Sequence, residues 1–195
     1  MKRRIAIPFA AALLAISLWS MTVLSADDDE KKAAQKAVLQ LVDTMKGKGA
    51  AQPQIAAITK KFDELEPIMW VYKPRKKGGI GMGKDGADDI EQTLGRIGNP
   101  RGKAKLTAQK LAAMKADLIT AGELSKAIAE ITAQDKYVQQ YAKKEPAKWK
   151  SYTKDMQKGA EELITAVNGA KVADVQKAAN NLSASCTSCH SDFRE

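Results

Sequence analysis

The last stretch of the chain combines a helical repeat with a cluster of reactive side chains. Apolar residues recur there at steps of three and four, the spacing of one face of an α-helix. The members of this repeat are Val172, Val175, Ala179, Leu182, Cys186, Cys189 and Phe193. Because Cys186, Cys189 and His190 stand at positions i, i+3 and i+4, a helix places all three on one face. The sequence therefore predicts a final helix whose core face carries two thiols and an imidazole.

Residues 186–190 form a C-x-x-C-H run, the spacing typical of covalent c-type haem attachment. Two thiols at this spacing can form thioethers with the two haem vinyl groups, and the imidazole can ligate iron. The chain has two cysteines and one histidine, all within this run. A zinc site lacks a fourth strong ligand, a disulfide here would be strained, and a thioredoxin-like pair needs a βαβ context. We predict one covalent haem c per chain, held by Cys186 and Cys189, with His190 as the proximal iron ligand.

The N-terminus has the organisation of an export signal. Three basic residues at 2–4 precede an apolar run over 5–24 that ends in small residues. We expect residues 1–26 to be a cleaved signal peptide and residues 27–195 to form one exported, periplasmic domain. An uncleaved membrane anchor is the alternative, because the apolar run approaches membrane-spanning length. Export agrees with the haem prediction, since c-type haem is attached outside the bacterial cytoplasm.

Helical stripes account for most of the remaining chain. They cover residues 27–48, 55–72, 88–97, 111–131, 149–167 and 172–193. Pro67 should kink or break the second stripe, and residues 73–86, rich in Gly, Pro and Lys, are typical of a loop. No strand pattern of useful length occurs. Helices with one apolar stripe must bury it against other helices, so we predict an all-α antiparallel four-helix bundle with an extra inserted helix.

The chain is basic, with 32 Lys and Arg against 23 Asp and Glu and a formal charge of +9. Loss of the three basic signal residues would leave about +6. A basic surface favours association with acidic redox partner proteins. Nucleic acid is not an expected partner, because the compartment is wrong, aromatic residues are few and no nucleic-acid motif occurs. A membrane contact is expected only if the N-terminal segment stays uncleaved.

The position of the motif resembles a known family. A C-x-x-C-H run on the last helix, followed by Phe193 and Arg194, resembles the class II cytochromes c, the group of cytochrome c-prime and its low-spin relatives. Class I cytochromes c carry the motif near the N-terminus. The resemblance is best over 149–194, whereas residues 27–72 match the first two helices in placement only. On this comparison, residues 88–140 are expected to be an insertion in the four-helix bundle.

The resemblance implies roles for particular residues. It implies thioethers at Cys186 and Cys189, His190 as proximal ligand, and Arg194 near the haem edge, where it can pair with a propionate. The alternative for Arg194 is a base that simply faces solvent. The resemblance also implies that the chain can form a homodimer through its early helices.

The sixth iron position separates two functions in this family. A methionine there gives a low-spin electron carrier, whereas an apolar residue leaves the iron open to small gases such as nitric oxide. Met45 is the core-facing methionine of the first helix, although it lies late in that helix, and Met69 and Met82 are alternatives. A methionine at helical spacing is also ordinary core filling. We predict electron transfer, with gas binding as the alternative. Catalysis is not expected, because no second histidine is present as a distal acid–base group.

Overall fold

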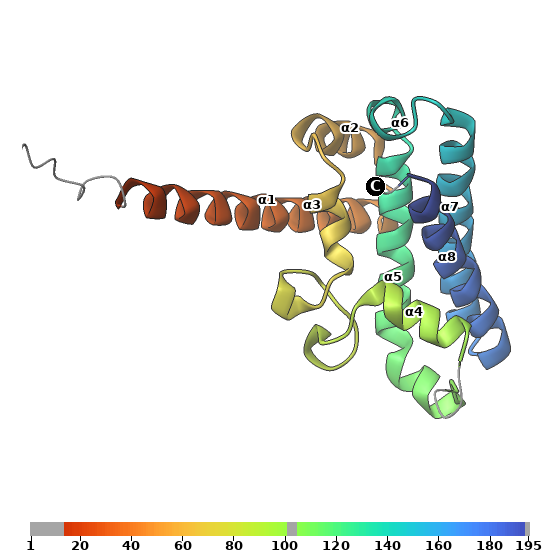
Figure 1. Cartoon of the computed structure of the whole chain (residues 1–195). Coiled ribbons are helices and arrows are strands. Elements are labelled where there is room, and N and C mark those ends of the chain that lie inside the picture. The colour runs from red at the N-terminus through yellow and green to blue at the C-terminus, as the bar shows by residue number, and fades with distance from the viewer. Residues whose placement is uncertain (1–13, 101–104, 194–195) are drawn as a thin grey trace, which may run out of the picture.

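The computed structural model describes residues 14–100 and 105–193, and every regular element in these ranges is a helix (Figure 1). In chain order the elements are α1 (Leu14–Lys46), α2 (Gln52–Lys61), α3 (Glu66–Met69), η1 (Trp70–Tyr72), η2 (Arg75–Lys77), η3 (Lys84–Gly86), α4 (Ile90–Gly98), α5 (Ala108–Thr132), α6 (Asp135–Tyr141), α7 (Pro146–Asn168) and α8 (Val172–Phe193). The expected all-α fold is confirmed.

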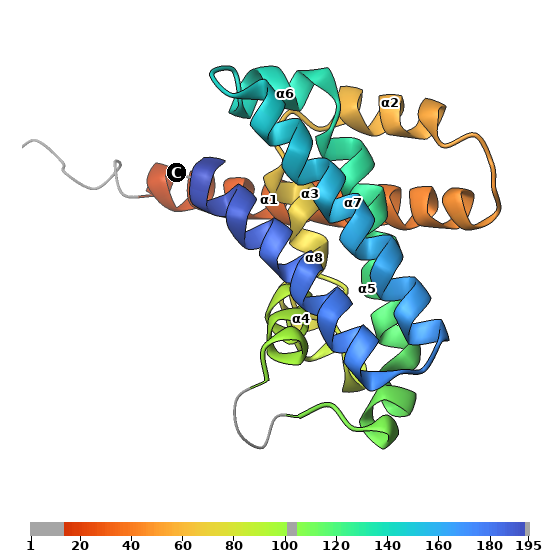
Figure 2. The same ribbon diagram turned by 90° about the vertical axis from the view of Figure 1, so that its right-hand side faces the viewer.

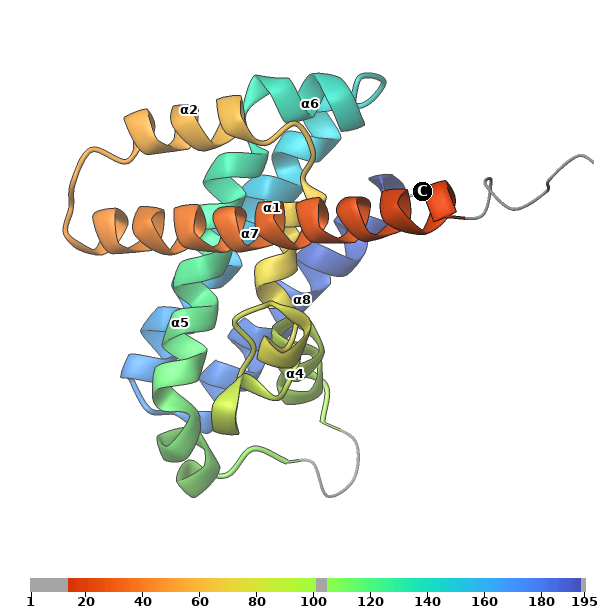
Figure 3. The same cartoon turned by 90° about the vertical axis from the view of Figure 1, so that its left-hand side faces the viewer.

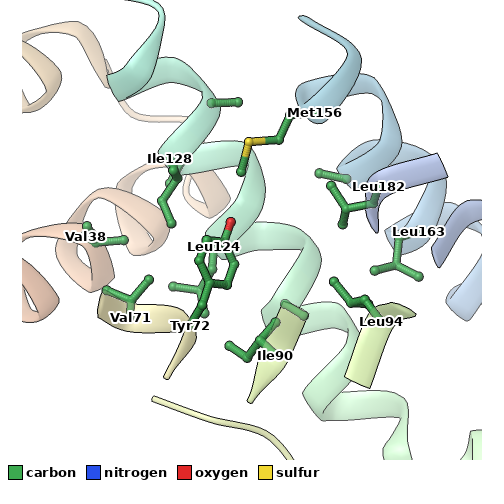
Figure 4. Close-up of a cluster of buried hydrophobic side chains, with 14 of the residues drawn as sticks. Val38, Val71, Tyr72, Ile90, Leu94, Leu124, Ile128, Met156, Leu163 and Leu182 are labelled. Atoms are coloured by element: carbon green, nitrogen blue, oxygen red, sulfur yellow. The ribbon is translucent and has the colours of Figure 1, made fainter. Parts of the chain in front are cut away.

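The helices α4, α5, α7 and α8 form a bundle. Helix α5 packs along α7, α7 along α8, and α8 along α4 (Figure 2). Only residues 169–171 connect α7 and α8, so these two helices run antiparallel. The facing side chains include Ile128 of α5, Leu163 of α7 and Leu182 of α8, all completely buried (Figure 4). These helices carry the apolar stripes that were expected to form the core.

Glycines allow the bundle helices to approach closely. A Cβ at Gly159 of α7 would lie 3.0 Å from the Cα atom of Leu182 on α8. A Cβ at Gly98 of α4 would lie 2.5 Å from the backbone N and Cα atoms of Asn180 on α8. Such distances are shorter than carbon contacts in packed interiors, so a side chain at either position would force the helices apart.

A second layer, made of α1, α2, α3 and η1, covers one side of the bundle. Helix α1 crosses α5 steeply, and α2 runs back beside α1 (Figure 3). Val38 and Leu41 on the inner face of α1 are completely buried. The second expected stripe is divided between α2 and α3, with Pro67 in the first turn of α3. Proline is tolerated there because the first N–H groups of a helix have no partner within the helix.

The helix bounds agree with the sequence stripes, with one addition. Helix α6 was not anticipated, because its seven residues are too few to show a clear repeat. Helix α1 begins at Leu14 and continues through residue 26, while the start of the expected signal peptide lies outside the described residues. None of the helices in the described ranges is long and apolar enough to cross a membrane. Signal cleavage stays a prediction.

Candidate functional site

The C-x-x-C-H motif lies in the last two turns of α8, on the face that was expected. Cys186, Cys189 and His190 are half-buried, whereas the intervening Thr187 and Ser188 are exposed. Both cysteines are free thiols. The spacing of the motif therefore directs its three functional side chains to the same side of the helix, as helical geometry requires.

This face of α8 borders a cavity of about 660 Å³. The opposite wall comes from α3 and η1, and the ends come from α4, α5, α6 and α7. Apart from the motif, its lining includes Glu64, Glu66, Met69, Trp70, Tyr72, Lys73, Glu91, Tyr141, Trp149, Tyr152, Met156 and Phe193. The volume falls within the range of ordinary cofactor and ligand pockets, about 300–1,000 Å³.

Aromatic side chains hold the end of α8 in place. The Trp149 ring of α7 stacks on the Tyr141 ring of α6, with centroids 5.9 Å apart, and meets the edge of Phe193 at 5.2 Å. The Trp149 Nε1–H donates to the carbonyl oxygen of Thr132, at the end of α5, over 2.8 Å. Offset and edge-to-face pairs of this kind add stability beyond the area that they bury. One tryptophan thus connects α5, α6 and α8 around the cavity.

Polar contacts reinforce this arrangement. The Tyr152 hydroxyl of α7 donates to Asp192 Oδ2 over 2.5 Å, and Lys148 Nζ lies 2.9 Å from the same carboxylate oxygen. Together these contacts lower the pKa of Asp192, with the Tyr152 hydrogen bond as the largest cause. Contacts of α7 with Asp192 and with Phe193 therefore hold the last turn of α8 against α7.

Both thiols are protonated at neutral pH. Burial raises the pKa of Cys186 to about 12, with a further contribution from the nearby Glu91 carboxylate. Burial also raises the pKa of Cys189 to about 11, and Asp192 adds to this shift. Catalytic, redox-active and metal-binding cysteines act as thiolates and sit where their pKa is lowered. The environment therefore disfavours a thiolate nucleophile or a thioredoxin-like pair.

Tyr72 lies on the wall opposite the motif. Its ring is completely buried, its hydroxyl donates to Ser125 Oγ of α5 over 3.0 Å, and burial holds its pKa well above the usual value (Figure 4). A neutral, anchored phenol is a rigid part of the wall. In the described residues, no group of three or more His, Cys, Asp or Glu side chains is arranged to hold a metal ion.

The expected distal candidates occupy different places. Met69 of α3 lines the cavity. Met45 is half-buried near the end of α1 and does not line it, and Met82 is buried in the loop before α4, also away from the cavity. Arg194 lies outside the described residues. The structure brings only Met69, of the three methionines, to the cavity that the motif borders.

Sequence reasoning missed Met156 and Tyr72 as lining residues. Met156 of α7 is nearly buried and borders the cavity, but its place in an apolar stripe made it look like ordinary core. Its role could have been predicted from its position on the same helix face as Trp149 and Tyr152, in the helix that directly precedes the motif helix. Tyr72 gave no such signal, because its position depends on the break that follows α2.

The side chains that border the cavity are suited to holding a haem. Two thiols and an imidazole at the attachment spacing border one space, and six aromatic and two methionine side chains are among the other residues that line it. A flat, largely apolar macrocycle buries well against such a surface. Fold and site together define a helical-bundle protein with a c-type haem motif on its last helix.

Residues 79–194 match the family model described as Cytochrome C', which covers more than half of the chain. The chain belongs to the cytochrome c′ family, and membership implies a covalently bound c-type haem. No match was found to a curated protein or to a solved structure. The matched region includes residues 88–140, where an insertion was expected, and that expectation stays a prediction. The described helices outside the match are α1, α2, α3, η1 and η2.

Proposed function

We propose that Cys186 and Cys189 form the two thioether bonds to a single haem and that His190 is its proximal iron ligand. The cavity beside these three side chains supports this assignment, because no other histidine or cysteine exists in the chain. The raised thiol pKa values also agree with it, since a thioether carries no charge and suits a buried position.

The attachment is tested by replacing both cysteines. In the Cys186→Ala, Cys189→Ala double variant, acidified organic solvent should extract the haem completely, whereas the haem of the parent protein stays with the chain. The matched control is Thr187→Ala, Ser188→Ala, which changes the exposed positions of the same motif and should leave the haem bound. Haem that stays attached to the double cysteine variant would refute the assignment.

We further propose that the protein is an electron carrier. The observation that carries this proposal is that Met69 and Met156 border the same cavity as His190. When bound, the haem iron supplies a one-electron redox couple, and a methionine as second axial ligand raises its reduction potential. Met69 is the first candidate, because α3 forms the wall that faces α8, whereas Met156 belongs to the helix paired with α8.

The optical spectrum tests this function. The holoprotein should show a low-spin spectrum, with a weak band at the red end in the oxidised form that is typical of methionine–histidine ligation. It should not respond to carbon monoxide, because the sixth position is filled. Met69→Ala should abolish that band and open the site to carbon monoxide. Met45→Ala and Met82→Ala are matched controls outside the cavity and should leave the spectrum unchanged. Loss of the band only in Met156→Ala would transfer the ligand role to Met156.

Gas binding is the second candidate function. It is favoured by the position of Met45, the methionine expected from the low-spin relatives, which does not line the cavity. Without a methionine ligand, the apolar wall would leave an open position for a small gas such as nitric oxide. A high-spin spectrum that shifts at once with carbon monoxide in the parent protein would favour this function over electron transfer.

Export completes the proposal. Residues 1–26 act as a signal that delivers the chain to the periplasm or another exported location, where haem is attached and acidic redox proteins are its partners. No catalytic activity is proposed, because His190 is the sole histidine and is used as a ligand. An intact mass for secreted protein that corresponds to residues 27–195 plus one haem would support cleavage and the stoichiometry.

A further inference from the structure

The loop between η1 and α4 carries a group of exposed cations. Arg75, Lys76, Lys77 and Lys84 are all exposed, and none of them forms an ion pair with an acid in the described parts of the chain. We refer to residues 75–84, which carry these four cations, as the basic loop. Unpaired charges on a surface are available to attract a molecule of opposite charge.

The backbone of the basic loop is held firmly. The Ile80 N–H donates to the Val71 carbonyl oxygen over 2.9 Å, and the Gly83 N–H donates to Asp117 Oδ2 of α5 over 2.9 Å. Met82, between them, is buried in the core. Docking on this loop would therefore order little backbone, which lowers the entropy cost of association.

The basic loop also touches the haem cavity. Trp70 lines the cavity, and its Nε1–H donates to the Lys77 carbonyl oxygen over 2.6 Å. The Lys31 ammonium, on a buried side chain, lies 3.8 Å from the centroid of the half-buried Trp70 ring. Lys73, the residue that leads into the loop, lines the cavity as well. One hydrogen bond thus links the Trp70 indole, which lines the cavity, to the backbone of the basic loop.

Charge around the cavity is uneven. Exposed Glu64 and Glu66 border it where α3 begins, and Glu91 of α4 borders it as well, whereas Lys73 and the basic loop lie where η1 ends. Asp85 is exposed next to Lys84, but the four cations of the loop outnumber this acid. A negatively charged molecule is attracted to the second side and repelled by the first. Approach from the side of the basic loop also brings that molecule to Trp70.

We propose that the basic loop is the docking surface for an acidic redox partner protein, with Trp70 between the haem cavity and that partner. This inference rests on the proposed electron-carrier function and specifies its partner site. The cations steer and orient the encounter, while the rigid backbone keeps them in place relative to the cavity.

The test compares two charge reversals of equal size in the holoprotein. Lys76→Glu, Lys77→Glu changes the basic loop, and Lys171→Glu, Lys177→Glu is the matched control. Both control lysines are exposed, and Lys177 precedes Cys189 by about 18 Å along α8, at 1.5 Å per residue. The readout is the second-order rate at which hexacyanoferrate(III), a small anion, takes one electron from the reduced protein and becomes hexacyanoferrate(II), measured by stopped flow at low and high salt.

At low salt, the loop variant should react about tenfold more slowly than the parent, whereas the control should change by less than about twofold, because steering depends on local charge. High salt should remove the difference. Polyglutamate, the acidic protein-like probe, should slow the parent reaction by occupying the loop and should have no such effect on the loop variant. Equal slowing of both variants would overturn the proposal, since only net charge would then matter.

Two further outcomes have distinct meanings. Loop-dependent binding to phosphatidylglycerol vesicles, without competition by polyglutamate, would overturn the protein partner and assign the loop to a lipid surface. A high-spin spectrum that responds to carbon monoxide would overturn the electron-carrier function, and the docking surface with it. The stopped-flow rates test the docking surface, and the spectrum tests the electron-carrier function. Because the two are measured separately, failure of one can be distinguished from failure of the other.

Discussion

At the residue scale, two side chains of α6 join this helix to the end of α2. Lys136, at the start of α6, places its ammonium 2.8 Å from the Thr59 carbonyl oxygen, 3.0 Å from that of Phe62 and 2.7 Å from Asp63 Oδ1. The Tyr137 hydroxyl donates to the same Phe62 carbonyl oxygen over 2.8 Å. The last carbonyl groups of α2 are otherwise without helical partners, so Lys136 acts as a cap supplied from another helix.

This cap should make stability depend on pH through Asp63. The Lys136 hydrogen bond lowers the folded-state pKa of Asp63 below its ordinary 3.8. The carboxylate therefore stabilises the fold above that ordinary value, and the contribution is lost as the pH falls through the lower folded-state pKa. Asp63→Asn should lower the free energy of unfolding at pH 7, and its difference from the parent should shrink below about pH 4 in urea titrations.

The matched control uses the partner. In a Lys136→Met background, Asp63→Asn should have a much smaller effect at pH 7, because the ammonium that lowers the pKa is gone. If Asp63→Asn is equally costly with and without Lys136, the interaction does not account for the pH dependence.

At the scale of the elements, helix crossings set the shape of the site. Helix α4 reaches α8 closely because Gly98 carries no side chain, and Gly159 does the same for α7 against α8. Together these contacts position α8, and with it the motif, relative to the rest of the bundle. The Trp149 contacts with α5, α6 and α8 then determine how its last turn borders the cavity.

Gly98→Ala should separate α4 from α8. The added methyl group would lie 2.5 Å from backbone atoms of Asn180, which cannot move without shifting α8. We expect a loss of about 1–3 kcal/mol in the free energy of unfolding, the usual cost of overpacking. Gly169→Ala is the control, because its nearest neighbour would be 3.5 Å away and its φ of −72° suits alanine. Urea titration measures both, and equal effects would contradict the close crossing.

At the scale of the whole molecule, the cavity is too large to be an ordinary packing defect. Its lining includes the exposed residues Glu64 and Glu66, so the space is open to water in the absence of a bound group. Aromatic and methionine side chains on the same wall then face water as well. A cofactor that fills the space would remove this apolar surface from water and stabilise the fold.

Removal of the haem should therefore weaken the whole fold. Residues 27–195 produced in a cytoplasm, where haem attachment does not occur, should melt at least about 10 °C below the holoprotein, since a few kcal/mol shift the Tm of a chain this long by that amount. Hydrogen exchange should be fastest in α3, η1 and the end of α8, which border the cavity. A haem-free chain with the same Tm and the same protection would show that the cavity is stable when empty.

The sequence by itself determined the long helices, though not the seven-residue α6, and the face of α8 that carries Cys186, Cys189 and His190. Both follow from local spacing, because the period of the α-helix converts positions along the chain directly into directions around it. The end of α7 at Asn168 was also local, since an Asn-Gly pair favours the end of a helix. The break in the second stripe falls at residues 62–65, and Pro67 lies just after it, in the first turn of α3.

Only the tertiary structure decided what faces the motif. Met45 and Met69 both belong to apolar stripes, yet only Met69 borders the cavity, because α1 crosses the bundle and carries Met45 away from α8. Likewise, Tyr72 and Met156 reach the cavity through the packing of η1 and α7 around α8. Helix crossings depend on contacts between distant segments, such as Gly98 against Asn180. The periodicity within one helix does not predict such contacts.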